Sequence, residues 1–162
     1  MVGPPASGKS TFCEDYFADH ERVNQDSLKT FAKCKKAAKG AIQNGKSVVI
    51  DNTNGSVEVR VSPLADKQTR KKWIDLASEV KVPIRVVVMD VSKPLARHLN
   101  GFRSIGLSGD GRRVPSVALN MFFSKYKAPK KEEGFQRVDT VPFVPKPFAS
   151  KEEEEFFYSV TY

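Results

Sequence analysis

The sequence predicts an α/β protein in which helices cover both faces of a parallel sheet. Two observations support this fold class. Segments with the apolar period of a helix alternate along the chain with short apolar segments. The apolar segments 47–51 and 83–90 are also continuous rather than alternating, as is typical of strands that are buried on both faces. Because such sheets bind ligands beyond the carboxyl ends of their strands, the residues that follow each strand are the candidates for a functional site.

The individual elements can be placed in order along the chain. The predicted helices share a 3.6-residue spacing of apolar side chains and cover 8–20, 27–44, 73–80, 94–100 and 115–126. The predicted strands are short and apolar, and they cover 22–24, 47–51 and 83–90. The long second helix is expected to end at Asn44-Gly45, a pair that favours a turn.

Composition narrows the class of protein. A chain of 162 residues is expected to form one domain. It has no apolar run of the roughly 20 residues that a membrane span needs, so no membrane partner is expected. Its two cysteines, Cys13 and Cys34, are too few for a disulfide framework and favour a reducing compartment.

The charge is unevenly distributed. The net charge is +8, yet residues 21–131 alone hold 23 Lys and Arg against nine Asp and Glu, a net of +14. A basic block of this size suggests a polyanionic partner. The alternative is that its lysines, such as Lys33 and Lys36, form the solvated face of a helix. Residues 149–162, with four consecutive glutamates, are expected to be a solvated acidic tail.

The N-terminal segment fits the pattern G-x-x-x-x-G-K-[ST], which is typical of a loop that binds nucleotide phosphates. Its candidate phosphate-binding residues are consecutive: Gly3, Pro4, Pro5, Ala6, Ser7, Gly8, Lys9, Ser10 and Thr11. The glycines let backbone N–H groups curl around phosphate, Lys9 reaches the β and γ phosphates, and the Ser10 hydroxyl is a ligand for Mg²⁺. Such a loop normally follows a central strand, but only Met1 and Val2 precede it here. We therefore expect the first strand to be truncated.

Polar residues after the later strands indicate where a phosphoryl group could go. Asp26 could accept the proton of an attacking hydroxyl, or it could simply cap the helix that follows it. Asp51 opens the segment Asp-Asn-Thr-Asn, which could contact metal-bound water or an acceptor, or could close a turn. Arg97 and Arg103 could close over the transferring phosphoryl group as a lid.

Taken together and in this order, these segments resemble the kinase domain of polynucleotide kinase/3′-phosphatase enzymes, which are P-loop kinases that phosphorylate 5′-hydroxyl ends of DNA. The matching segments are Val2 to Phe12, Val23 to Leu28, Val49 to Asn54, Ala96 to His98, Phe102-Arg103, Tyr126 to Pro129 and Glu133 to Phe135. The resemblance implies a P-loop kinase-like sheet within a domain of residues 1–148. It also implies ATP and Mg²⁺ as cofactors, a nucleic acid with a 5′-hydroxyl end as partner, and the nucleus as compartment, although the cytoplasm stays open, as does the choice of DNA over RNA.

The resemblance also assigns roles. Asp26 would be the general base, while Lys9, Arg97 and Arg103 would steady the phosphoryl group. Ser10 and Asp51 would help to hold the metal. Contacts to the nucleic acid would come from Asp51, Thr53 and Arg60.

Three departures from the family pattern bear on function. Gln25 stands where animal relatives usually carry arginine, which removes a charge beside the base. Residues 61–70 resemble an insertion, because without them Arg60 would run into Lys71 on one helix, and Pro63 would break that helix. The family's upstream phosphatase domain is absent from this sequence, so no 3′-phosphatase activity is expected.

Two other functions stay open: a P-loop kinase for a small hydroxylated metabolite, and an inactive fragment that binds nucleotide or nucleic acid.

Overall fold

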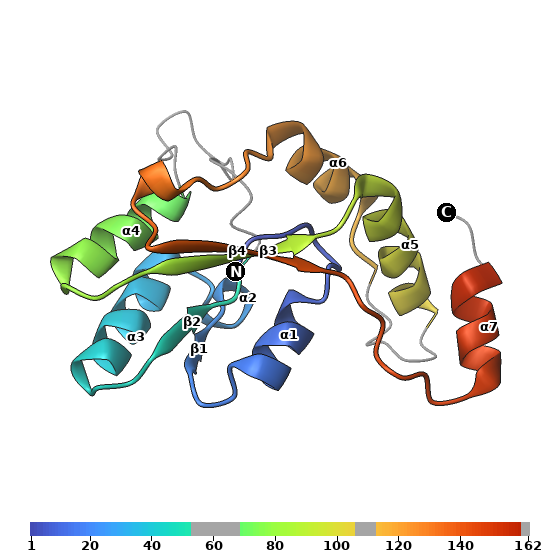
Figure 1. Ribbon diagram of the computed structural model, residues 1–162, viewed down its shortest axis with the longest axis horizontal. Helices are drawn as coiled ribbons and strands as arrows, with labels where there is room; N and C mark the ends of the chain where they lie inside the picture. Colours follow the sequence, from blue (N-terminus) through green and yellow to red (C-terminus); the bar gives the residue numbers. More distant parts are fainter. Residues whose placement is uncertain (53–68, 106–112, 160–162) are drawn as a thin grey trace.

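The computed structural model describes residues 1–52, 69–105 and 113–159 (Figure 1). Their helices are α1 (Lys9–Tyr16), α2 (Gln25–Leu28), α3 (Phe31–Gln43), α4 (Thr69–Glu79), α5 (Lys93–Ser104), α6 (Ser116–Lys125), the short 3₁₀ helix η1 (Lys131–Glu133) and α7 (Lys151–Ser159). The strands are β1 (Glu21–Val23), β2 (Val48–Ile50), β3 (Arg85–Asp90) and β4 (Arg137–Pro142). Up to α5 the strands alternate with helical segments, of which the second consists of two helices, α2 and α3, and the α/β class is confirmed.

The sheet consists of two parallel pairs. β1 pairs with β2 in the register Arg22 to Val49, and β3 pairs with β4 along six residues. Between the two pairs run Met1 and Val2. Val2 N donates to Val87 O and Val2 O accepts from Met89 N, both at 2.8 Å. On the other side the Met1 amine donates to Ile50 O at 2.9 Å. Met1 and Val2 therefore fill the centre of the sheet over a length of two residues.

Helices cover both faces of this sheet. On one face, α3 and α4 bury Cys34, Ala38, Trp73 and Leu76 against side chains of β1 and β2. On the other face, α1, α5, α6 and α7 surround Val49, Val87 and Met89 with a larger apolar cluster. Both faces are thus apolar, which is why the sequence of the inner strands is a continuous apolar run.

The predicted helix over 27–44 is wrong in one respect, because the structure divides it into α2 and α3. Lys29, between them, has a φ of 69°, a left-handed conformation that no residue inside an α-helix adopts. The Thr30 hydroxyl then caps α3 by accepting from Lys33 N at 3.3 Å. The break leaves α2 as a separate turn directly after β1, so that Asp26 lies at the carboxyl end of that strand.

The C-terminal segment contributes to the core. Within the predicted acidic tail 149–162, helix α7 packs Phe157 against Phe102 and His98, with ring centroids 4.9 and 4.6 Å apart respectively. The glutamates of α7 are mostly exposed, although Glu153 is buried and accepts from Ala149 N at 2.7 Å. The boundary between 148 and 149 stays a prediction, but the apolar side of this helix is continuous with the larger cluster.

Most of the predicted insertion 61–70 lies outside the described residues. Its last two residues, however, begin helix α4. Arg70 reaches across to Glu133, with its Nε and Nη2 each 2.8 Å from a carboxylate oxygen, and donates to Lys127 O at 2.9 Å. Arg70 therefore belongs to the packed structure. Among the described residues, no helix is long and apolar enough to cross a lipid bilayer.

Candidate nucleotide-phosphate site

The loop from Gly3 to Gly8 links the centre of the sheet to α1. The close contacts and the conformation of its backbone explain why glycine occurs at these two positions. A Cβ atom on Gly3 would lie 2.8 Å from Ser7 Oγ and 2.9 Å from Met89 Cβ, so no larger residue fits there. Ala6 and Gly8 have φ values of 62° and 78°, which turn the chain sharply into the helix. Gly8 has no side chain to cap α1, and the first amides of the helix are thus available to an anion.

Lys9 lies folded over this loop. Its Nζ donates to Pro4 O at 2.6 Å and to Ser7 Oγ at 3.4 Å, and the side chain is 8% exposed. Burial lowers the pKa of Lys9 to about 8, although the carboxylates of Asp51 and Asp26 act in the opposite direction and Arg103 lowers the pKa further. The structure thus brings Asp26, Asp51 and Arg103 within electrostatic reach of the loop lysine.

Asp51, directly after β2, is 2% exposed and is held by four donors on its Oδ2 atom. These are Ser10 Oγ at 2.9 Å, Arg22 Nε and Nη2 at 2.9 and 2.6 Å, and Asn24 Nδ2 at 3.2 Å. Burial acts to raise the pKa of Asp51, but the hydrogen bonds from Arg22 and Ser10 outweigh it and the pKa is lowered. Asp51 is therefore a buried anion beside the hydroxyl that follows Lys9.

Arg22 is a site residue that the sequence analysis missed. It lies on β1, joins Asp51 to Glu14 on α1, and is 2.7 Å from the Glu14 carboxylate. The only signal in the sequence is an arginine next to the buried Val23 in a short strand. Its pairing with a carboxylate 29 positions later depends on the register of β1 and β2, which the sequence does not reveal.

Asp26 lies in the first turn of α2 and is exposed. The helix is capped by Asn24, whose Oδ1 accepts from Asp26 N at 2.7 Å and from Ser27 N at 3.3 Å. The alternative interpretation of Asp26 as the capping residue is therefore wrong. Asn24 Nδ2 also donates to Asp51 O at 3.0 Å, which ties the end of β1 to the end of β2. This bond fixes the position of Asp26 relative to Asp51.

The two predicted lid arginines point in different directions. Six positions along a helix correspond to a rotation that leaves side chains about 120° apart. Arg103 lies close enough to influence Lys9, whereas Arg97 donates to Asn120 Oδ1 on α6 at 3.2 Å. Asn100, between them, is buried and binds both backbone groups of Val114 at 2.8 Å. Thr53 and Arg60 lie outside the described residues.

A phosphate-binding loop between the centre of a parallel sheet and a helix, with a buried carboxylate after the neighbouring strand, defines a P-loop protein of the nucleotide-binding α/β class. The chain matches the family model described as "AAA domain" over residues 29–129, which is more than half of its length. It therefore belongs to that family, and its fold is the P-loop kinase-like one that the sequence analysis expects.

Similarity to individual proteins gives more specific information than the match to the family model. The chain is 46% identical over 145 residues to a bifunctional polynucleotide phosphatase/kinase of Schizosaccharomyces pombe, an alignment that covers 88% of this chain and 33% of the relative. It is 37% identical over 146 residues to a putative bifunctional polynucleotide phosphatase/kinase of Acanthamoeba polyphaga mimivirus, with 88% and 32% covered. It is also 31% identical to the Arabidopsis thaliana transcription factor bHLH140, over 85% of this chain and 15% of that protein. The chain spans about a third of the length of the first two relatives.

Proposed function

We propose that this chain catalyses transfer of the γ-phosphate of ATP to the 5′-hydroxyl end of a polynucleotide, with DNA as the favoured acceptor. Strand-break repair in the nucleus is the proposed setting, on the resemblance alone. The observation that carries the proposal is the arrangement of Asp26 and Asp51 at the ends of neighbouring strands, with the charge of both carboxylates acting on the loop lysine Lys9. The names of the two phosphatase/kinase relatives support a polynucleotide as acceptor.

The loop residues would bind the donor. Lys9 now donates to Pro4 O and Ser7 Oγ, and a phosphate oxygen in the loop could take over either bond. The backbone N–H groups at the start of α1 would hold the same phosphate chain, helped by the helix dipole. Arg103, whose charge reaches Lys9, would offset negative charge on the phosphoryl group in transit.

The residues beside Lys9 fit a magnesium ion that arrives with the nucleotide. Ser10 Oγ and Asp51 Oδ2 lie 2.9 Å apart and are both oxygen donors, the ligand type that Mg²⁺ prefers. The described residues form no cluster of three or more His, Cys, Asp or Glu that would hold a metal unaided. Two protein ligands suit an ion that takes its other ligands from phosphates and water. Such an ion would neutralise charge on the phosphate oxygens.

On the acceptor side, the exposed Asp26 carboxylate would take the proton of the 5′-hydroxyl. A bond then forms between the 5′ oxygen and the γ-phosphorus while the bond from that phosphorus to the bridging oxygen of the leaving ADP breaks. Asn24 would position the base, because it binds the backbone of both Asp26 and Asp51. Since the transition state is loose, most of the rate gain would come from positioning and charge neutralisation.

The test is transfer of labelled γ-phosphate to single-stranded, nicked and blunt oligonucleotides that carry a 5′-hydroxyl. Asp26→Asn is expected to lower kcat by at least about 100-fold, because that is the usual contribution of a general base. Measured at about pH 6.5, where Lys9 keeps its proton, the Kd for ATP is expected to stay within about twofold, since Asp26 acts on the loop through the charge of Lys9.

The matched control is Asp75→Asn, which removes an exposed carboxylate that pairs with Lys71 on α4. This variant should transfer phosphate at the wild-type rate. Equal loss of ATP binding and transfer in Asp26→Asn would give Asp26 a structural role. Phosphorylation of small hydroxylated metabolites, with no oligonucleotide phosphorylated, would support the metabolite kinase instead.

A further inference from the structure

Helix α2, which carries Asp26, has few contacts of its own. It consists of four residues, none of which is fully buried, and Leu28 at its end packs at the edge of the cluster around Cys34 and Trp73. A single helical turn orders more backbone than its hydrogen bonds stabilise, so it depends on contacts from outside. The position of the Asp26 carboxylate therefore depends on what holds the start of α2.

Two asparagine side chains hold the start of this helix. The first three N–H groups of any α-helix have no partner within it. In α2, Asn24 Oδ1 accepts from Asp26 N at 2.7 Å and from Ser27 N at 3.3 Å. The N–H group of Gln25 is left over, and it donates to Asn52 Oδ1 at 2.9 Å. All three N–H groups are thus satisfied, one of them by a residue from another part of the chain.

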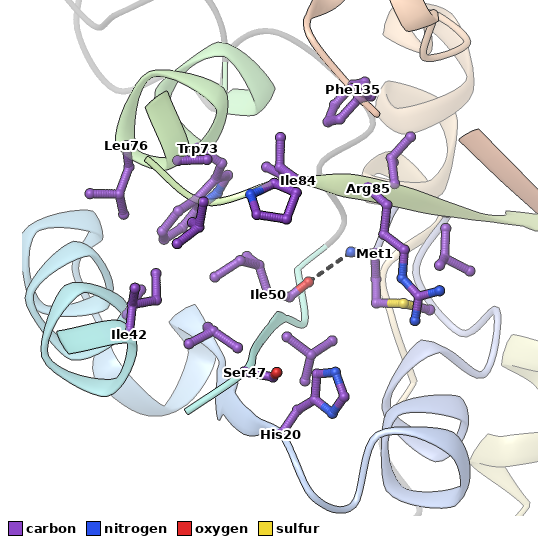
Figure 2. Close-up of a pocket in the computed structure, with 18 of the residues that line it drawn as sticks. Met1, His20, Ile42, Ser47, Ile50, Trp73, Leu76, Ile84, Arg85 and Phe135 are labelled. Atoms are coloured by element: carbon purple, nitrogen blue, oxygen red, sulfur yellow. Dashed lines mark hydrogen bonds between the residues drawn. The ribbon is translucent and has the colours of Figure 1, made fainter. Parts of the chain in front are cut away.

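Asn52 extends from a part of the fold that is itself fixed. It lies two residues beyond β2, next to Asp51, whose N–H group donates to Val23 O on β1 at 2.9 Å. On the other side, Ile50 lines a cavity of about 620 Å³, and its oxygen accepts from the Met1 amine at 2.9 Å (Figure 2). The end of β2 is thus bound on both sides, and Asn52 links α2 to it.

The orientation of the Asn52 side chain follows from its partner. A backbone N–H group can only donate, so the oxygen of the Asn52 amide has to face Gln25. The Nδ2 atom is buried and has no hydrogen-bond partner in the part of the chain that the structure describes. Since an unpartnered buried donor costs free energy, stability alone does not explain an asparagine at this position.

The same arrangement leaves the Asp26 carboxylate available. An acidic side chain in the first turn of a helix is stabilised by the unpaired N–H groups there and can accept from them. Here those groups already donate to Asn24 and Asn52. Within residues 1–52, 69–105 and 113–159, no group donates a hydrogen bond to the Asp26 carboxylate. The carboxylate can therefore accept a proton from a substrate.

We propose that Asn52 is a positioning residue for phosphoryl transfer. By accepting from the Gln25 N–H group it holds the start of α2 against the end of β2, and thereby fixes the Asp26 carboxylate relative to Asp51. This inference rests on the proposed function, because Asp26 acts as a base only in that reaction. Asn52 touches neither substrate, so the loss of its bond should slow the transfer step rather than weaken ATP binding.

The first test is Asn52→Ala in the full chain, with transfer of labelled γ-phosphate to a 5′-hydroxyl oligonucleotide. A base displaced by about 1 Å can lose about 100-fold in rate, so kcat should fall at least about tenfold. The Kd for ATP, measured at about pH 6.5, where Lys9 is charged, should stay within about twofold. A wild-type kcat, or a loss of ATP affinity as large as the loss of kcat, would overturn the proposal.

The matched control is Ser150→Ala, which removes the same kind of bond from another helix. Ser150 Oγ accepts from Glu153 N at 3.2 Å at the start of α7, and α7 lies far from α2 (Figure 1). The loss of this cap should lower the midpoint of thermal unfolding by roughly a few degrees and leave kcat at the wild-type value. A kcat that falls as far in the control as in Asn52→Ala would contradict the proposal, because lost stability would then explain both variants.

The second test removes the donor of the same bond. Proline has no N–H group, suits the first position of a helix, and favours an extended residue before it. Gln25 occupies that first position, and Asn24 before it has a φ of −122° and a ψ of 128°. In a Gln25→Pro background, where the bond no longer exists, Asn52→Ala should change kcat by less than about threefold. A further tenfold loss in that background would show that Asn52 does not act through Gln25.

Amide hydrogen exchange follows the bond independently of activity. In Asn52→Ala the Gln25 amide should exchange at least about fivefold faster, while the amides of β1 and β2 should keep their wild-type rates. Unchanged exchange at Gln25, or equal acceleration in both strands, would refute the role of Asn52. A wild-type chain that phosphorylates no oligonucleotide would overturn the proposed function instead, whereas the exchange rates alone decide whether Asn52 holds α2.

Discussion

At the residue scale, Lys9 is a buried charged group of the site. Its ammonium is bound to Pro4 O and Ser7 Oγ, and its pKa of about 8 lies well below that of a lysine in water because the side chain is buried. A lysine that loses its proton near pH 8 has an unusual consequence for ligand binding. The charged form alone attracts phosphate, so binding must depend on pH in a range where ordinary lysines stay charged.

We therefore predict that the affinity for ATP falls above about pH 8. Below this pH Lys9 carries its proton in the free protein, and above it the proton must be taken up when the nucleotide binds. The Kd should rise by up to about tenfold for each pH unit. The phosphate groups of ATP do not titrate in this pH range, since their last pKa is about 6. Calorimetric titration at pH 7.5, 8.5 and 9.5 measures the effect.

Lys9→Met is the matched control for this titration. It should bind ATP more weakly at every pH and show little change between pH 7.5 and 9.5. A wild-type Kd that stays constant up to pH 9.5 would contradict the lowered pKa of Lys9.

The residues of the site differ in how far the sequence could predict them. The loop lysine and Ser10 belong to a local pattern, and Asp51 follows an obvious strand, so all three could be placed from the sequence alone. Arg22 could not, because its role arises from contact with Asp51 across two paired strands. The separation of Arg97 from Arg103 could have been predicted from helical geometry, since six positions place them on different sides of α5.

At the element scale, the junctions of the helices depend on single residues in left-handed conformations. Lys81 follows α4 with a φ of 56°. Val82 N donates to Ala77 O at 3.0 Å and Lys81 N to Ser78 O at 3.2 Å, the bond pattern of a Schellman motif. Glycine is the usual residue at such a position, because a Cβ atom is strained there.

We predict that Lys81→Gly raises the free energy of unfolding by about 0.5–1 kcal/mol, through relief of this strain. The matched control is Lys36→Gly, the same change at an exposed position inside α3, where it should lower the free energy of unfolding by about 1 kcal/mol. Urea unfolding followed by circular dichroism measures both. The same sign for the two variants would contradict the assignment of a left-handed cap at Lys81.

The sequence predicted the central elements better than the junctions and the C-terminal part. Helix 27–44 was predicted as one piece because Leu28 and Phe31 continue the same apolar period across the break. Strand β4 is not predicted, because its residues are exposed or only partly buried, and an arginine, an aspartate and a proline interrupt its apolar pattern. The four consecutive glutamates of α7 favour a solvated tail in the sequence, whereas Phe156 and Phe157, which follow them, pack on the core.

At the scale of the whole molecule, ion pairs use part of the basic charge between residues 21 and 131. Lys35 and Lys39 on α3 both bind Glu79 on α4, with distances of 3.1 and 2.7 Å. Lys46 pairs with Glu21 at 3.4 Å. The ion pairs of Lys35 and Lys39 therefore help to join two helices, a role that differs from the solvated helix face named as the alternative for these lysines. A nucleic-acid surface is better sought among the basic residues near Asp26.

Lys29 is the basic residue that the structure places beside the proposed base. It ends α2, is exposed, and donates from Nζ to Asp26 O at 2.6 Å. An acceptor strand whose 5′ end reaches Asp26 would bring its first phosphates close to this ammonium. Each phosphate contact of a lysine releases condensed counterions, so it makes binding weaker as salt rises.

We predict that the affinity for a single-stranded 5′-hydroxyl oligonucleotide falls linearly in a plot of log K against log salt concentration. Lys29→Gln should make that slope shallower by about 0.7, the contribution of one phosphate contact to a single strand. Lys35→Gln should leave the slope unchanged, because Lys35 pairs with Glu79 on the α3–α4 face. Fluorescence anisotropy between about 50 and 200 mM salt measures all three proteins. A wild-type affinity that does not respond to salt would exclude a polynucleotide track and favour a small acceptor.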